Sequence, residues 1–538
     1  MSVELRNIGI EIEQILLDYV AKPGITGTSS ETLATDFVMQ HIRAMPYFQK
    51  YPENCGAYPI PGDAFGRYVC WALVKGNVFP DGNESGEENS STVVLLHHSD
   101  VVDIEDFNQL REYAFSPYEL ERELLKIADT LPHGARDDLR SGDWMFGHGP
   151  CDMKAGGAIQ LALIRRYSEV LDFNGNILLL SVPDEENLSA GMRSGVTLLR
   201  KLKQAHGLDY RLLINSEPHQ RENSDIGIFS LGSIGKIMPF VYARGVLTHA
   251  GKPHLGFNPL GLLGRIVQKT EMSADFYTDN GVKSWEIPPT WLYLRDSKTS
   301  YDVSMPLSAY GCLNVLTLVP DAAMLKIENI CREAFSETVE TLTAAGSAEW
   351  RTDVTRFSEI LSQACRCEGF FEAYRVELAI LVEKINEGKF SMIDGTFAAI
   401  EFVCGYIDEQ SPRIVLGIAP PFYPSVSNPK LETAQKLIEF TKSAFSQEYI
   451  TEDYFTGISD MSYTDAVETD GALIANMPMS AAYHIPFDDI AAISMPCINI
   501  GPWGKDFHKL TERVYKKDIF IRTPAIIKEA IEITFECL

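Results

Sequence analysis

The stretch TVVLLHHSD, residues 92–100, decides the fold. Its apolar half, Thr92–Leu96, has the length of a buried strand, and titratable side chains follow it directly. Three further apolar runs of strand length are also bounded by turn residues: Ile177–Val182, Arg211–Ile214 and Cys497–Ile500. Helix-period segments lie between the runs, notably 154–171 and 190–205. This alternation predicts an α/β fold with a mostly parallel, mixed sheet.

Changes in local composition divide the chain into two parts. The pattern changes around Lys236, and a Pro-rich segment at Ala419–Ser427 indicates a second boundary. The 538 residues also exceed what one hydrophobic core usually supports. We predict one α/β domain, residues 1–235 and 427–538, that is interrupted by an inserted α+β domain, residues 236–426.

The charge balance excludes several classes of partner. The chain has 47 Lys and Arg against 74 Asp and Glu, a formal charge of −27. Nucleic acids and anionic membranes are bound mainly through basic patches, so we expect neither as a partner. The acidic first turns do not resemble a secretory signal, and charge-free stretches such as 303–320 are broken by Pro, Gly and Asn. We expect a cytoplasmic protein.

Histidine and acidic residues gather where the predicted strands end. They are His97, His98 and Asp100 after the first run, Glu185 and Glu186 after the second, Glu217 after the third, and His508 after the fourth. One more acid, Asp152, lies in GHGPCDMKAGG (147–157), a turn that opens a helix. Ligands of open α/β sheets bind beyond the carboxyl ends of the strands. We therefore expect these groups at one edge of the sheet.

Two divalent metal ions account for this convergence. Each of these residues, taken singly, is best interpreted as a polar loop residue. Together, two imidazoles and several carboxylates would repel and desolvate one another unless a cation lay among them. Mixed imidazole and carboxylate ligands suit Zn²⁺, with Mn²⁺ or Co²⁺ as substitutes. Because the groups outnumber the ligands of one catalytic zinc, we predict a pair of metals that share a carboxylate.

Five motifs together resemble one known family. They are HHSDVVD (97–103), GHGPCDMKAGG (147–157), SVPDEEN (181–187), NSEP (215–218) and GPWGKDFHKLTER (501–513). They are similar to those of the co-catalytic zinc peptidases and amidohydrolases, which include aminoacylase, glutamate carboxypeptidase, succinyl-diaminopimelate desuccinylase and peptidase T-like tripeptidases. Within that family the chain most resembles the arginine-utilisation branch. The resemblance implies a three-layer, phosphorylase/hydrolase-like catalytic domain with an inserted lid domain.

The resemblance also implies a role for each residue of the cluster. His98, Asp152 and Glu217 would hold one metal, and Asp152, Glu186 and His508 the other, with Asp152 as the bridge. Glu185 would be the general base. Asp100 would accept the second imidazole N–H of His98 and orient the ring, since residues i and i+2 of an extended segment point the same way. By the same argument His97 points away, and we expect it to pack or to support a ligand.

The inserted segment contains a further match, RGVLTHAGKP (244–253). It resembles the family's lid motif, whose histidine stabilises the oxyanion and in some members reaches the partner subunit's active site. We therefore predict that His249 stabilises the oxyanion. The lid is also the candidate surface for a homodimer.

Four departures from the family pattern stand out. The 54 positions from His98 to Asp152 are more than usual, so residues 103–141 are interpreted as an insertion with a surface helix that could wall the substrate cleft. His148 stands where an arginine is common and is a second-choice metal ligand. The segment GISDM (457–461) is not followed by the arginine that binds a substrate carboxylate in several members. The inserted domain is also larger than usual.

We predict metal-dependent hydrolysis of an amide bond in a small N-acyl amino acid or a short peptide. Two alternatives stay open. One is a ureido-amide hydrolase of the same fold, and the other is a metal-binding protein that binds or regulates without turnover. The presence of Glu185 beside the ligand set favours hydrolysis, because a purely structural metal site needs no extra carboxylate.

Overall fold

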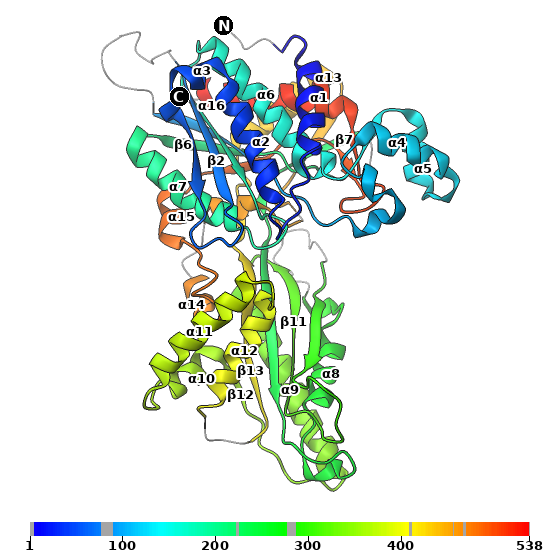
Figure 1. Ribbon diagram of the computed structural model, residues 1–538, viewed down its shortest axis with the longest axis vertical. Coiled ribbons are helices and arrows are strands. Elements are labelled where there is room, and N and C mark those ends of the chain that lie inside the picture. Colours follow the sequence, from blue (N-terminus) through cyan, green and yellow to red (C-terminus); the bar gives the residue numbers. More distant parts are fainter. Residues whose placement is uncertain are drawn as a thin grey trace. The chain divides into compact units, whose positions relative to one another are not determined.

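The computed structural model describes residues 5–76, 90–221, 225–276, 287–407, 411–455, 457–465 and 470–536. The chain forms two compact units (Figure 1), and each is described here by itself. The first comprises Met1–Ser233, Val426–Ala466 and Pro486–Leu538, and the second comprises Ile234–Ser425 and Val467–Ile485. The stretch 467–485 thus returns to the second unit, although the sequence analysis placed it in the first. None of the described helices combines the length and the low polarity that crossing a bilayer requires.

A mixed sheet forms the centre of the first unit. Within the described residues its strand order is β1-β2-β5-β3-β6-β16-β7-β15. The strands are β1 Cys55–Pro59, β2 Tyr68–Lys75, β5 Asn176–Val182, β3 Ser91–His98, β6 Asp209–Asn215, β16 Cys497–Asn499, β7 Ile226–Ser230 and β15 Glu448–Glu452. The four apolar runs of the sequence are β3, β5, β6 and β16, which are neighbours and run parallel. The predicted α/β class with a mostly parallel, mixed sheet is confirmed.

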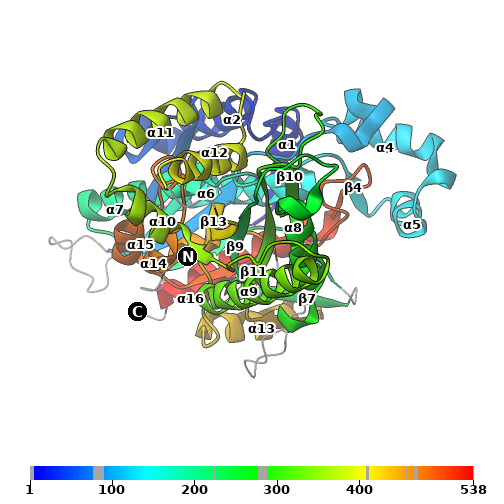
Figure 2. The same cartoon turned by 90° about the horizontal axis from the view of Figure 1, so that it is seen from below.

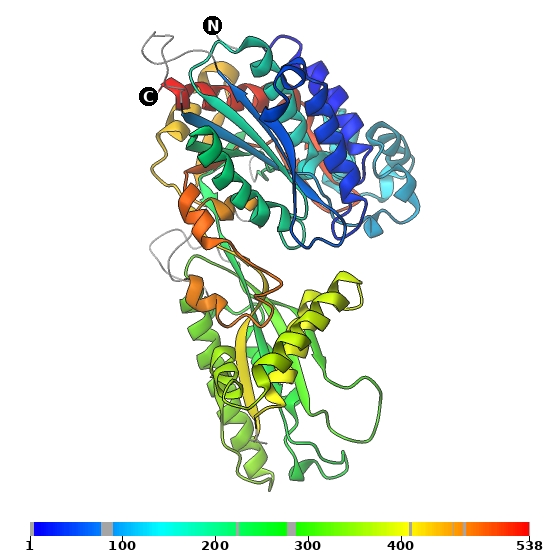
Figure 3. The same ribbon diagram turned by 60° about the vertical axis from the view of Figure 1, so that its left-hand side comes forward.

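Helices cover both faces of this sheet (Figure 3). One face packs on α1 (Ile8–Val20), α2 (Glu31–Ala44), α6 (Ala155–Val170), α13 (Glu432–Phe445) and α16 (Thr523–Glu536). Alternate strand residues such as Val93 and Leu95 point into this core, as the period of two in a strand requires. On the opposite face, Gly195 of α7 (Ala190–His206) lies against Leu180, and α15 (Phe487–Ile493) packs on α7. The result is a three-layer arrangement.

Residues 103–141 form a small helical subdomain rather than a single surface helix. It contains the 3-10 helices Glu105–Tyr113 and Ala128–Thr130 and the α-helices α4 (Pro117–Lys126) and α5 (His133–Ser141). It has its own apolar cluster, which includes Phe107, Leu120 and Leu139. The cluster continues onto a three-stranded sheet of β4 (Trp144–Phe146), β18 (Arg513–Tyr515) and β17 (Gly504–Lys505).

The second unit is built on another sheet, with strand order β10-β11-β9-β13-β12 in the described ranges. The strands are β9 Gly235–Arg244, β10 Thr290–Asp296, β11 Ser308–Thr317, β12 Val354–Arg356 and β13 Arg413–Tyr423. Two helices, α8 (Pro259–Thr270) and α9 (Pro320–Ala344), contact one part of it, and α10 (Phe357–Ala364), α11 (Phe370–Asn386) and α12 (Met392–Cys404) cover the face with Phe240 and Tyr310. The view in Figure 2 shows α9 and α12 on opposite sides of the strands.

Candidate metal centre

The parallel strands β3, β5 and β6 bring the predicted ligands to one edge of the first unit's sheet. His98 is the last residue of β3, Glu185 and Glu186 follow β5, and Glu217 follows β6. Asp152 comes from the turn before α6. Because parallel strands end at the same edge, residues more than 100 positions apart meet there.

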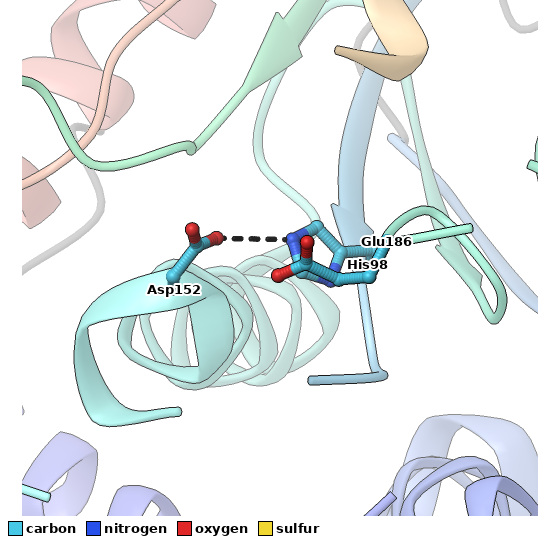
Figure 4. A group of neighbouring side chains, drawn as sticks. All are labelled: His98, Asp152 and Glu186. Atoms are coloured by element: carbon cyan, nitrogen blue, oxygen red, sulfur yellow. Dashed lines mark hydrogen bonds and ion pairs between the residues drawn. The ribbon is translucent and has the colours of Figure 1, made fainter. Parts of the chain in front are cut away.

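Asp152 lies between two histidines. The Nε2 of His98 is 3.2 Å from Oδ1 of Asp152, and the Nε2 of His508 is 3.3 Å from its Oδ2. His98 also lies 3.5 Å from Glu217, and His508 lies 3.0 Å from Glu186. Figure 4 shows the Asp152 carboxylate directed at the His98 ring, with Glu186 beside it. One carboxylate with an oxygen toward each imidazole has the arrangement of a bridging ligand.

These side chains have the composition of a cation site. Among the described residues, two groups have potential ligand atoms that all lie within 4.8 Å of one another: His98 with Asp152 and Glu186, and His98 with Glu185 and Glu217. Imidazole and carboxylate donors at this spacing suit zinc, manganese or cobalt. The carboxylates would repel one another in this buried place without cations. The donor set therefore fits a pair of divalent metals.

The pKa shifts of these side chains agree with the interpretation of the cluster as a cation site. Burial raises the pKa of Glu217 to about 8 and raises the pKa of Glu185 well above its usual range. Burial would lower the pKa of His508, but hydrogen bonds with Asp152 and Glu186 raise it to about 11. Burial thus disfavours the charged form of these carboxylates, and a bound cation would relieve this cost.

Asp100 contacts three residues of the cluster, Glu185, Glu186 and His98. Its Oδ1 accepts the backbone N–H of Glu185 and its Oδ2 that of Glu186, both at 3.1 Å. The Nδ1 of His98 is 3.0 Å from the backbone oxygen of Asp100 and 3.5 Å from its carboxylate. The carboxylate therefore fixes the turn with the two glutamates, while the carbonyl is the nearer partner of the imidazole.

The remaining histidines near the cluster have other partners. The Nδ1 of His97 is 2.9 Å from the side-chain oxygen of Gln160, and burial lowers its pKa to about 4. Both ring nitrogens of His148 are engaged, one with Glu512 at 3.1 Å and one with the backbone oxygen of Val102 at 2.8 Å. His148 therefore links Glu512 to the backbone at Val102 and has no ring nitrogen left for a metal. Its second-choice assignment as a metal ligand is not favoured.

Two supporting residues were missed by the sequence analysis. Glu512 accepts the backbone N–H groups of Gly149 at 2.8 Å and Cys151 at 3.2 Å, and so holds the turn that presents Asp152. Arg67 is 2.5 Å from Asp184, which precedes the two glutamates and has a left-handed backbone (φ 71°). Both residues lie far along the chain from the groups they hold. The only local signal was that Glu512 stands in the last motif, GPWGKDFHKLTER (501–513).

His249 belongs to the second unit. Its Nδ1 accepts the backbone N–H of Gly251 at 3.0 Å, and its side chain is exposed. The backbone of His249 also pairs with that of Ser304 in an isolated antiparallel β-bridge. Its predicted role in stabilising an oxyanion stays a prediction.

The three-layer fold and the donor atoms at its sheet edge, together with the family match that follows, place the protein among hydrolases that act on amide bonds. The chain belongs to peptidase family M20/M25/M40, whose model matches residues 128–492. The resemblance inferred from the five motifs is thereby confirmed.

Curated relatives and solved structures agree with this assignment. The chain is 31% identical over 541 residues to the protein YqjN of Bacillus subtilis, with 97% of this chain and 96% of YqjN covered. It is 28% identical over 548 residues to the protein RocB of the same organism, with 96% of this chain and 94% of RocB covered. The fold is similar to that of the di-peptidase Dug1p of Saccharomyces cerevisiae, with a TM-score of 0.54, 11% identity and 100% and 99% of the two chains covered.

Proposed function

We propose that the protein hydrolyses an amide bond in a small N-acyl amino acid or short peptide at a dinuclear metal site. His98, Asp152 and Glu217 would hold one ion, and Asp152, Glu186 and His508 the other. The observation that carries the proposal is the position of Asp152, which has one carboxylate oxygen toward His98 and the other toward His508. Zinc is the first choice, with manganese and cobalt as substitutes.

Glu185 would move the proton in this reaction. When bound, the two ions polarise the scissile carbonyl and acidify the attacking water. Glu185 lies within 4.8 Å of the His98 and Glu217 ligand atoms, and this closeness supports its role as the general base. Its carboxylate would take a proton from the water and give it to the departing amine.

The second unit would act as the lid, with His249 stabilising the oxyanion and with dimerisation through this unit. Family relatives support the choice of substrate class. The di-peptidase Dug1p shares the fold, and a succinyl-diaminopimelate desuccinylase of Dinoroseobacter shibae is 24% identical over 255 residues. Peptide and N-acyl amide substrates are therefore the first to test.

The test compares the wild-type protein with Glu185→Gln after loading with Zn²⁺, Mn²⁺ or Co²⁺. Amine release is measured from a set of N-acyl amino acids and dipeptides, and ammonia release from carbamoyl amino acids. Loss of the general base should reduce kcat by about 10²–10⁴-fold with metal content unchanged. Glu119→Gln is the matched control, because this side chain is exposed on α4.

Unchanged turnover in metal-loaded Glu185→Gln would contradict the assigned mechanism. Two bound metals without any turnover on all substrates would favour a metal-binding protein without catalysis. Ammonia release alone would favour the ureido-amide alternative.

A further inference from the structure

The histidine ligand on the C-terminal motif is the least protected of the proposed metal ligands. The side chain of His508 is 43% exposed, against 14% for Asp152 and 1% for His98. It lies in the loop between β17 and β18. We call this loop, together with the strand residue at each of its ends, the His508 loop (residues 505–513). Asp506 and His508 have left-handed backbones, with φ of 55° and 64°. Such conformations cost energy in residues other than glycine and persist only where the surroundings impose them.

The insertion, residues 103–141, supplies hydrogen bonds to this loop. The Oδ2 of Asp106 accepts the backbone N–H of Leu510 at 2.6 Å. The Oδ2 of Asp138 accepts from Lys505 at 2.8 Å and from Arg513 at 2.7 Å. The contacts thus reach the first residue, the last residue and the middle of the His508 loop. Two carboxylates of the insertion therefore restrain the loop along its length.

Apolar packing also holds the insertion against the His508 loop. The apolar cluster of the insertion includes Trp144 and Trp503, and Leu510 of the His508 loop packs against it. The ammonium of Lys505 lies 4.4 Å from the Trp144 ring centroid and 4.7 Å from that of Trp503. Cation–π contacts of this length add to the hydrogen bond that Lys505 makes with Asp138. The insertion is thereby packed on the segments at both sides of His508.

The restraint extends to a second ligand. Glu512 lies in the same loop and accepts the backbone N–H groups of Gly149 and Cys151. It therefore holds the turn from which Asp152 points at the two imidazoles. The ligands that depend on the His508 loop are thus His508 itself and, through Glu512, Asp152. Both belong to the proposed ligand set of the second metal.

We propose that the insertion is a positioning module that sets the affinity of the metal held by His508. This inference rests on the proposed dinuclear site. The role differs from the cleft wall expected from the sequence, because it acts through Asp106 and Asp138 on a loop within the same unit. The module makes no contact with substrate in this role. Its two aspartates are positioning residues rather than catalytic ones.

The experiment titrates metal-free protein with Zn²⁺ against a chromophoric chelator and with Co²⁺ by visible absorption. The variants are Asp106→Ala, Asp138→Ala and the double variant, with circular dichroism to verify folding. The second ion should bind about 10–100-fold more weakly, the usual effect of losing a residue that orients a ligand. The first ion should lose less affinity, because Asp152 is its only ligand that depends on the His508 loop. Asp106→Asn keeps an oxygen for the N–H of Leu510 and should restore the second affinity.

The matched control is Asp129→Ala, which removes an exposed carboxylate of the insertion that is paired with Arg140. It should leave both affinities unchanged. Wild-type affinity for both ions in the folded double variant would overturn the inference, as would an equal loss at both sites. If the double variant does not fold, the two single variants are subject to the same criterion. Failure of the wild-type protein to bind two ions would instead overturn the proposed site itself.

Discussion

Replacement of Asp100 by asparagine tests how the ligands are held. The carboxylate is fully buried and its two oxygens accept the backbone N–H groups of Glu185 and Glu186, each at 3.1 Å. Asparagine has nearly the same shape but only one accepting oxygen. In either orientation of the amide, its NH₂ group faces one of the two N–H donors.

The magnitude follows from this mismatch. A buried N–H group that loses its acceptor costs about 1–3 kcal/mol. If the cost falls on the metal-bound arrangement of the turn, this free energy corresponds to a loss of about 5- to 150-fold in affinity. We expect Asp100→Asn to weaken metal binding by this amount, and to lower kcat/KM at limiting metal, because the same turn presents the proposed base.

The assay is competition for Zn²⁺ with a chromophoric chelator, together with amine release at limiting and saturating metal. Asp18→Asn is the control, because Asp18 is exposed on α1 and accepts a hydrogen bond from Gln14. An Asp100→Asn variant that is folded and has the zinc affinity and kcat/KM of the wild-type protein would refute the reasoning. Asp100 would then be a passive part of the core.

Three further predictions concern the cluster and its surroundings. Zinc binding should release protons, because neighbouring carboxylates raise the pKa of His98 and His508, burial raises the pKa of Glu217 to about 8, and each of these ligands must be deprotonated to bind a metal. Apparent affinity should therefore rise with pH, as calorimetry in buffers of different ionisation enthalpy will measure, and an affinity independent of pH would contradict the prediction. Chelation should lower Tm in scanning fluorimetry, and free zinc at 100 times its Kd should restore about 2.7 kcal/mol of stability; a constant Tm would argue against the site. Gly501→Ala should destabilise the protein by about 1–3 kcal/mol and weaken metal binding, because its Cβ would lie 1.8 Å from the backbone oxygen of Glu217. Gly261→Ala, where the new Cβ meets nothing within 4 Å, is the control.

The centre of the first unit's sheet could be predicted from the sequence because its strands are buried on both faces. The runs that became β3, β5, β6 and β16 are almost wholly apolar, as strands between two helical layers must be. The strand β2 was not predicted, although it is the neighbour of β5. The place of β2 in the sheet depends on its pairing with β5, which lies about 100 residues further along the chain. No local sequence pattern encodes such a pairing.

The candidate ligands could be predicted from the parallel direction of these strands. Parallel strands deliver their last residues to one edge, so His98 and Glu217 are neighbours by topology. The supporting residues could not be predicted in this way. Glu512 holds Gly149 from 363 positions away, and Arg67 reaches Asp184 over 117. Their contacts arise from loop packing, which follows the fold and not the local sequence.

The insertion shows the same limit. Its mixed charges indicated one surface helix, whereas the structure has a small subdomain of several helices. Within it, Asp106 and Asp138 are indistinguishable in sequence from solvated acids. Their partners, Leu510 and Arg513, are more than 370 residues further along the chain. Only the three-dimensional arrangement distinguishes these two carboxylates from their neighbours.

X-ray anomalous scattering at the zinc edge, recorded on crystals of zinc-loaded protein, tests the central claim most directly. We predict two peaks about 3.5–4 Å apart, with Asp152 between them. One peak should lie beside His98 and Glu217, and the other beside Glu186 and His508. A single peak, or peaks away from these residues, would contradict the dinuclear site.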